Sequence, residues 1–177
     1  MIILLHLKFV CLFVSENVGG KTLVEKSLTS FFRNGELITG VGFYSKGIDT
    51  NLGSVRLQLF KLSNEERFKF LWDQYLIGSN GVLMMYDITH SNSLNKITEF
   101  IQKVKNRLRS VPILLVGNKL DLEEKREVSK EEVDKFKEKH DISFSMEISL
   151  KTGENVEEMF MKLAEMIFMR WKESLNQ

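Results

Sequence analysis

The residues best suited to hold a phosphate group lie between positions 15 and 22, in the run Ser-Glu-Asn-Val-Gly-Gly-Lys-Thr. An apolar stretch precedes this run and an amphipathic stretch follows it, which is the strand-then-helix context that the phosphate-binding motif GxxxxGK[ST] requires. Small residues let backbone N–H groups converge on a phosphate, Lys21 supplies positive charge, and the Thr22 hydroxyl is suited to bind Mg²⁺. Ser15 replaces the first glycine and strains the turn without forbidding it. The alternative interpretation is an ordinary helix start made flexible by two glycines.

A second group of polar residues follows a later apolar run, in the segment Gly-Asn-Lys-Leu-Asp at 117–121. The Asp121 carboxylate can accept hydrogen bonds from both the ring N–H and the exocyclic amine of guanine, a pair of donors that adenine does not present. A third group, 149–151, comes directly after another predicted strand. Ligands of open α/β sheets bind at the carboxyl ends of strands. Each polar residue alone fits a solvated loop, but together and in this order they favour a ligand site at this edge of the sheet.

Taken in order, these motifs resemble the Ras-like small GTPases, and most closely their Rab branch. The resemblance runs the whole chain and includes the phosphate loop, NKxD at 118–121, SLK at 149–151 in place of SAK, and 58–68 as the counterpart of another family segment. It implies a switch that binds GTP or GDP with Mg²⁺. It also implies that effector or regulatory proteins bind through the 36–50 and 61–76 loops.

The resemblance also assigns roles to individual residues. Asn118 would bridge the base edge and the phosphate loop, the stem of Lys119 would cover the purine, and the backbone N–H near Leu150 would meet the guanine carbonyl. Lys151 would support the other face of the base. The implied nucleotide-binding set is Asn17, Val18, Gly19, Gly20, Lys21, Thr22, Leu23, Asn118, Lys119, Asp121, Ser149, Leu150 and Lys151.

The family's DxxGQ segment, which holds the magnesium shell and positions the attacking water, corresponds here to Lys-Leu-Ser-Asn-Glu at 61–65. Lys61 cannot accept a hydrogen bond from a metal-bound water and repels Mg²⁺, so it is expected to weaken the metal site or to neutralise phosphate directly. Asn64 replaces a glycine, but asparagine tolerates unusual backbone angles, so its N–H is able to keep the contact with the terminal phosphate. Glu65 replaces the catalytic glutamine and would either accept a proton from water or be repelled by phosphate oxygens.

The first loop departs from the family as well, because Thr-Gly-Val-Gly-Phe at 39–43 resembles TIGVDF with one residue missing. Thr39 and Ile38 are therefore both candidates for the second metal position beside Thr22. Asn17 and Val18 stand where the family keeps small residues near the terminal phosphate. We expect crowding there to slow hydrolysis.

These observations lead to one favoured function and two rivals. We expect a GTP/GDP-binding switch with slow or atypical hydrolysis, in which Lys21 and Glu65 are the candidate catalytic residues. The first rival is a pseudo-GTPase interaction module that binds nucleotide statically or not at all. The second, an adenine-nucleotide enzyme with a phosphate loop, is disfavoured by Asp121.

The composition sets the frame for these motifs. With 177 residues, 43% hydrophobic, the chain is expected to form a single domain over 1–177. The 25 Lys and Arg nearly balance the 24 Asp and Glu, so the net charge of +1 does not indicate a nucleic-acid partner. One cysteine excludes an intrachain disulfide, and three scattered histidines do not predict a zinc site.

Apolar runs and amphipathic segments alternate along the chain. Strands are predicted at 9–14, 82–86, 113–116 and, more weakly, 142–148, with a hairpin formed by 44–49 and 55–60. Helices are predicted at 22–32, 93–108, 130–139 and 156–171. This pattern favours an α/β sheet covered by helices on both faces. The resemblance makes it a Ras-like fold with six mostly parallel strands, one antiparallel edge strand and about five helices.

The two ends of the chain bear on its location. The apolar opening at 1–14 is predicted to be a buried strand, because a signal peptide would need a basic start and a small-residue cleavage site. Ile2 and a terminal segment without cysteine predict neither N-myristoylation nor prenylation, so we expect a monomeric cytoplasmic protein without its own lipid anchor. Phe168, Met169 and Trp171 lie at helical spacing and are expected to cover the sheet rather than form a partner patch.

Overall fold

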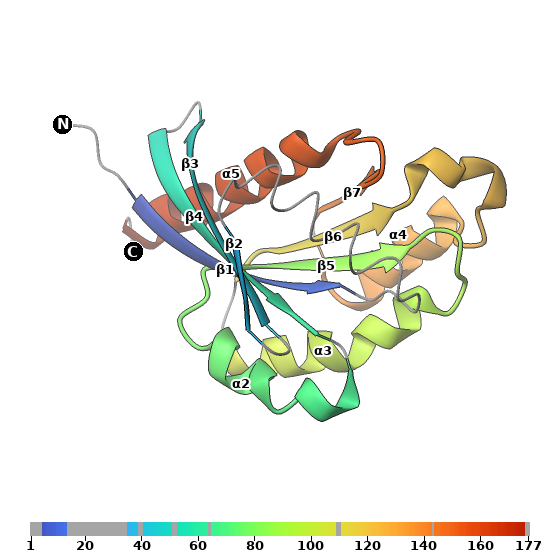
Figure 1. Cartoon of the computed structure of the whole chain (residues 1–177), viewed down its shortest axis with the longest axis horizontal. Coiled ribbons are helices and arrows are strands. Elements are labelled where there is room, and N and C mark those ends of the chain that lie inside the picture. Colours follow the sequence, from blue (N-terminus) through green and yellow to red (C-terminus); the bar gives the residue numbers. More distant parts are fainter. Residues whose placement is uncertain are drawn as a thin grey trace.

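The computed structural model describes residues 5–13, 35–38, 41–50, 53–63, 65–108, 111–142 and 144–175. One sheet forms the centre of this part of the chain, with strand order β2-β3-β4-β1-β5-β6-β7 (Figure 1). Its strands are β1 (Leu5–Phe13), β2 (Gly35–Ile38), β3 (Val41–Thr50), β4 (Gly53–Leu62), β5 (Gly81–Asp87), β6 (Ile113–Asn118) and β7 (Phe144–Ile148). The helices of this part are α2 (Leu71–Leu76), α3 (Ser93–Arg107), α4 (Lys130–Lys139) and α5 (Val156–Leu175), with 3-10 helices η1 (Glu66–Phe68) and η2 (Leu120–Lys125).

The sheet corrects the predicted strand count and the place of the antiparallel strand. The described residues form seven strands instead of six, because the short segment β2 adds to β3 at the edge. β3 is the antiparallel strand, and it lies inside the sheet between β2 and β4. Strands β4, β1, β5, β6 and β7 run parallel. Four residues are too few to show an alternating pattern, which is why the sequence did not reveal β2.

The apolar opening of the chain forms β1, so the strand interpretation of this segment is confirmed. β1 pairs with β4 on one side and with β5 on the other, which makes it an inner strand of the sheet. It covers 5–13 rather than the predicted 9–14. The helix predicted at 22–32 lies outside the described residues.

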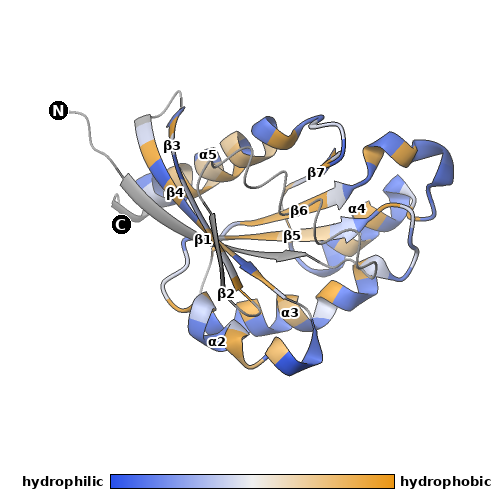
Figure 2. Ribbon diagram, in the orientation of Figure 1, coloured by the Kyte–Doolittle hydropathy of each residue, from blue (hydrophilic) through white to orange (hydrophobic). Residues whose placement is uncertain are grey.

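Helices cover both faces of the sheet, as the alternating pattern predicts. α5 lies on one face, and α2 and α3 lie on the other (Figure 1). β5 contributes to both cores, since Leu83 and Met85 belong to the α5 cluster while Val82 and Met84 belong to the cluster with α2, α3 and α4. Figure 2 shows the corresponding apolar colour along β5 and β6. A strand buried on both faces has no need of polar alternation, which explains the continuous apolar runs.

The helices begin and end where their sequences favour it. α4 starts with a capping box, in which the Ser129 side chain accepts from the Glu132 N–H and the Glu132 side chain accepts from the Ser129 N–H.

α5 is longer than predicted, and on it Phe168 is buried and Trp171 packs against the core. Met169, by contrast, is 57% exposed, so the prediction that it covers the sheet is wrong. No helix of the described part is both long and apolar enough to span a membrane.

Candidate functional site

The carboxyl ends of three neighbouring strands bring the polar groups together. The register of the sheet pairs Asp87 of β5 with Asn118 of β6, and Asn118 with Ile148 of β7. Directly beyond these ends come η2, which contains Asp121, and the turn that contains residues 149–151. The motifs at 118–121 and 149–151 therefore meet at one edge, as their positions after strands predict.

The end of β6 contains a glycine in a crowded position, and the residue directly after the strand has a left-handed backbone conformation. A Cβ at Gly117 would lie 2.8 Å from the Tyr86 hydroxyl and 2.9 Å from the Ile88 Cγ2, so no larger residue fits without movement. The backbone of Lys119 then adopts φ 75° and ψ 35°, a left-handed conformation that is uncommon for residues other than glycine. Its ammonium contacts the Asp87 carboxylate at 2.6 Å. This ion pair holds the Lys119 side chain at the strand ends.

Two hydrogen bonds join the 118–121 segment to the 149–151 segment. The Leu150 N–H donates to Asn118 Oδ1 at 3.0 Å, and the Ser149 hydroxyl donates to Asp121 Oδ1 at 2.6 Å. Ser149 is fully buried, and its oxygen also accepts from the Thr152 N–H at 3.1 Å, which fixes the direction of the hydroxyl proton. The structure thus brings these predicted base-binding residues into direct contact.

The environment of Asp121 favours its charged form. Burial by itself raises the pKa of this carboxyl, but the hydrogen bond from Ser149 and the interactions with Lys151 outweigh burial, so the pKa lies below its ordinary value. The Lys151 ammonium is 3.4 Å from Asp121 Oδ2. Asp121 is therefore a fixed, ionised acceptor at the strand edge, which is the group that a pair of N–H donors on a planar base requires.

The other predicted residues divide into two sets. The side chains predicted to form the phosphate and metal sites lie outside the described part of the structure, so their roles stay predictions. They are Asn17, Val18, Gly19, Gly20, Lys21, Thr22, Leu23, Ile38 and Thr39. Asn64 also lies outside the described residues. The described part contains no group of three or more His, Cys, Asp or Glu side chains placed to hold a metal ion.

Lys61 lies at the end of β4, and Glu65 lies just beyond it. The Glu65 carboxylate is paired with the Arg67 guanidinium, with Nε at 3.0 Å and Nη2 at 2.9 Å from Oε2. Its backbone N–H donates to the Ser63 hydroxyl at 3.2 Å. Lys61 is the penultimate residue of β4 and lies in register with Cys11 of β1 and Gly42 of β3. Glu65 is thus turned toward a neighbour in its own loop.

Sequence reasoning missed three charged residues at this edge. Asp87, the partner of Lys119, follows an apolar strand and would have been found by the rule that located Asp121. Arg126, just beyond the end of η2, forms an ion pair with Glu147 of β7. No pattern in the sequence predicts that contact, because isolated charges on a loop and on a strand are ordinary solvated residues.

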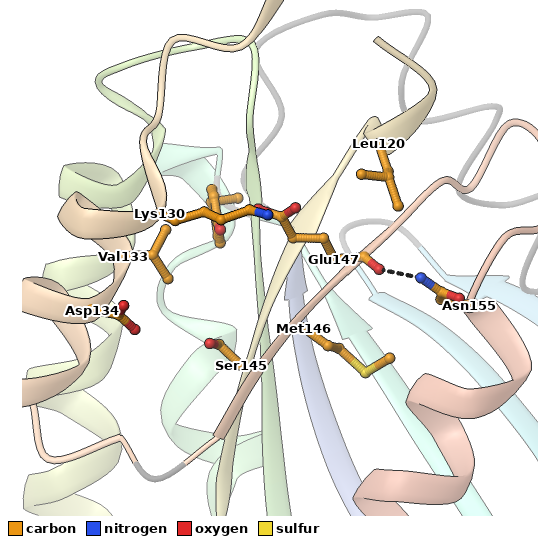
Figure 3. Close-up of a pocket in the computed structure, with 9 residues that line it drawn as sticks. Leu120, Lys130, Val133, Asp134, Ser145, Met146, Glu147 and Asn155 are labelled. Atoms are coloured by element: carbon orange, nitrogen blue, oxygen red, sulfur yellow. Dashed lines mark hydrogen bonds between the residues drawn. The ribbon is translucent and has the colours of Figure 1, made fainter. Parts of the chain in front are cut away.

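A cavity of about 450 Å³ opens beside this edge, between α4 and β7 (Figure 3). Lys130 and Asp134 of α4, together with Ser145 and Glu147 of β7, are among its lining residues. None of the predicted nucleotide-binding residues lines it. The cavity is therefore separate from the contacts of Asp121.

The family model described as Ras family matches residues 9–169. Rab-4 of Dictyostelium discoideum is 39% identical over 150 residues, which cover 84% of this chain and 73% of that protein. Rab-13 of Bos taurus is 34% identical over 167 residues, covering 93% of this chain and 82% of that protein. Rab-13 of Canis lupus familiaris is also 34% identical over the same length.

The chain therefore belongs to the Ras family and is similar to Rab proteins within it. This membership implies a GTP-binding molecular switch, since GTP or GDP with Mg²⁺ is what members of the family generally bind.

Proposed function

We propose that the chain is a GTP/GDP-binding switch whose hydrolysis is slow or atypical. The observation that carries the proposal is the Asp121 carboxylate, held in its ionised form by Ser149 and Lys151 at the strand ends. An anion fixed in this way suits the two N–H donors of guanine and does not suit the adenine edge. The Asn118 side chain accepts a hydrogen bond from the Leu150 N–H, which connects the 149–151 segment to the 118–121 segment.

The phosphate end of the proposed site rests on sequence. Lys21 would neutralise phosphate charge, and Thr22 would bind Mg²⁺, with Thr39 as a further ligand. Lys61 would weaken the metal site, because an ammonium cannot accept a hydrogen bond from a metal-bound water. A single domain over 1–177, a monomeric protein and a cytoplasmic location stay predictions.

Slow hydrolysis is supported by the state of Glu65. Its carboxylate is paired with Arg67 and carries a negative charge at a position where the family uses a neutral amide. Both features make it a poor group for orienting water toward anionic phosphate oxygens.

Single-turnover measurement of GTP loss, with Mg²⁺ and over hours, tests this proposal. Slow but measurable loss is expected, and Glu65→Gln is expected to accelerate it by restoring the amide. Arg67→Gln is the matched control, since it removes the ion pair between Arg67 and Glu65 without supplying an amide at position 65. No GTP loss at any protein concentration would contradict hydrolysis.

A static interaction module is the second candidate, and the packing of α2 favours it. Trp72 is buried, donates its indole N–H to the Ser63 carbonyl at 2.9 Å, and meets Phe100 of α3 edge-on. Asp73 of α2 forms ion pairs with Lys103 and Arg107 of α3. These contacts hold α2 against α3. The 61–76 segment was predicted to be a loop but contains η1 and α2, and the 36–50 segment, predicted likewise, contains β3 and most of β2.

Hydrogen exchange with GDP and with a non-hydrolysable GTP analogue separates the two candidates. A switch changes the protection of the 36–50 and 61–76 segments between the two nucleotides. An identical pattern in both segments would contradict the switch and support the static module. Phe70, which is exposed within the second segment, is available to an effector or regulatory protein in either case.

A further inference from the structure

Arg126 and Glu147 form a two-pronged ion pair beside the base-recognition segments. Arg126 Nη1 lies 2.8 Å from Glu147 Oε1, and Nη2 lies 2.7 Å from Oε2. This parallel geometry is the strongest arrangement that an arginine and a carboxylate adopt. The two side chains are only 14% and 19% exposed, so water screens them poorly. The hydrogen bonds that Arg126 donates to Glu147, and then those to Glu123, raise its pKa above the ordinary value.

The position of this pair matters more than its strength. Arg126 comes five residues after Asp121, just beyond the end of η2, and Glu147 comes two residues before Ser149 on β7. The pair therefore joins the two segments that supply the base-binding groups, which are also joined by the Ser149–Asp121 and Leu150–Asn118 contacts.

Further hydrogen bonds extend the pair to the neighbouring elements. Arg126 Nη1 also donates to the Val128 carbonyl at 3.0 Å, and the Val128 N–H donates to the Ile88 carbonyl beyond β5 at 3.0 Å. The Glu147 carbonyl accepts from Asn155 Nδ2 at 2.9 Å, as the dashed line in Figure 3 shows. Arg126 is thus connected through Val128 to the loop after β5, and the backbone of Glu147 contacts the turn before α5.

We propose that Arg126 and Glu147 are positioning residues of the nucleotide site, which hold the Asp121 segment and the Leu150 segment in register for guanine. They act through Asp121, Ser149 and Leu150 and do not touch the nucleotide. The inference rests on the proposed function, because it assigns them to the same site. Misplacement of binding groups by about 1 Å is enough to lose most of a geometry-dependent interaction.

A second carboxylate on Arg126 provides a matched control for the test of Glu147. Glu123 also pairs with Arg126, with Nε at 3.0 Å from Oε1, but Glu123 lies on η2, in the same segment as Arg126. Glu123→Gln therefore removes a carboxylate from the same guanidinium without cutting the connection between segments. Glu147→Gln makes the same chemical change in the residue that joins the two segments, where it removes the charge and leaves one acceptor oxygen in place of two. Arg126→Lys keeps the charge but loses the parallel geometry, and it provides a milder variant if Glu147→Gln folds poorly.

Hydrogen exchange of the nucleotide-free variants tests the positioning directly. We expect Glu147→Gln to accelerate exchange of the Leu150 N–H about tenfold or more, Arg126→Lys to accelerate it less, and Glu123→Gln to leave it unchanged. Exchange in β3, on the far side of the sheet from β7, is expected to stay constant. Equal effects of Glu147→Gln and Glu123→Gln, or a uniform acceleration over the whole described chain, would overturn the proposal.

Base discrimination supplies the second readout. Inosine diphosphate lacks the exocyclic amine of guanine, so one charge-assisted hydrogen bond to Asp121 sets a GDP preference of roughly ten- to a hundredfold. Glu147→Gln is expected to lower that ratio toward one and to release a fluorescent GDP faster, while Glu123→Gln retains both wild-type values. A wild-type protein that binds no guanine nucleotide would contradict the proposed function, and the exchange measurement would still decide whether the pair orders Leu150. An unchanged GDP preference in Glu147→Gln would overturn the inference.

Discussion

Replacing Asp121 by asparagine tests the base-recognition chemistry with the smallest change in shape. Asparagine keeps one carbonyl oxygen, which can still accept the hydroxyl of Ser149 as Asp121 Oδ1 does at 2.6 Å. The amide nitrogen then replaces Oδ2, and it presents N–H donors where guanine also presents donors. Xanthine carries a carbonyl in place of the exocyclic amine and is therefore a better partner for the variant.

The size of the effect follows from the bonds that are lost. Two hydrogen bonds to a charged carboxylate contribute about 1.5–3 kcal/mol each, so their loss weakens GDP binding by roughly 10²- to 10⁴-fold. We expect xanthosine diphosphate to bind Asp121→Asn more tightly than GDP does, which reverses the wild-type order.

Competition of GDP and xanthosine diphosphate against a fluorescent nucleotide measures this order. Asp134→Asn is the matched control, because it makes the same change on an exposed residue of α4 and should leave both affinities unchanged. Thermal unfolding of each variant shows whether the fold is intact. A folded Asp121→Asn protein that keeps the wild-type ratio of GDP to xanthosine diphosphate would refute the role of Asp121.

Four further predictions concern stability and the metal. Gly117→Ala should destabilise the fold by about 1–3 kcal/mol in urea, since its Cβ would lie 2.8 Å from the Tyr86 hydroxyl; a change below the error of the measurement would contradict this packing. The lowered pKa of Asp121 means that its contribution to stability is complete above the unfolded-state pKa and is lost as the pH falls through the lower folded-state pKa. The stability difference between wild type and Asp121→Asn should therefore shrink below about pH 4, and a pH-independent difference would oppose the assignment. Trp72→Phe removes the donor to a backbone carbonyl and should cost about 1–3 kcal/mol in urea unfolding, whereas an unchanged midpoint would show that the bond is dispensable. Chelation of Mg²⁺ by EDTA should accelerate GDP release much less than in the Rab relatives because of Lys61, and a large acceleration would show that Lys61 does not substitute for the metal.

The parallel part of the sheet was largely predictable from the sequence. The runs at 82–86 and 113–116 became β5 and β6 within two residues at each end, and the segment at 130–139 became α4 with the predicted bounds. These elements bury apolar side chains in regular patterns that strongly favour one structure. The predicted strands 44–49 and 55–60 proved too short, because backbone pairing extends β3 and β4 beyond the alternating side chains.

The base site was predictable as a set of residues but not as a set of contacts. Asp121 and Ser149 were both identified from their places after strands, while their hydrogen bond joins positions 28 residues apart. The Arg126–Glu147 pair could not be foreseen, since its two charges become partners only when η2 and β7 pack together. Long-range pairing of charges depends on the tertiary fold and leaves no periodic signal in a single sequence.

Identifying the nucleotide that the freshly purified protein carries is the most direct test of the central claim. The protein is denatured and the released nucleotide is separated by chromatography, with adenine and guanine nucleotides as standards. We expect guanine nucleotide in near-stoichiometric amount, as GDP if hydrolysis proceeds and as GTP if it is very slow. Recovery of adenine nucleotide, or of none from a protein that also fails to bind added GTP, would contradict the claim that Asp121 and its neighbours form a guanine site.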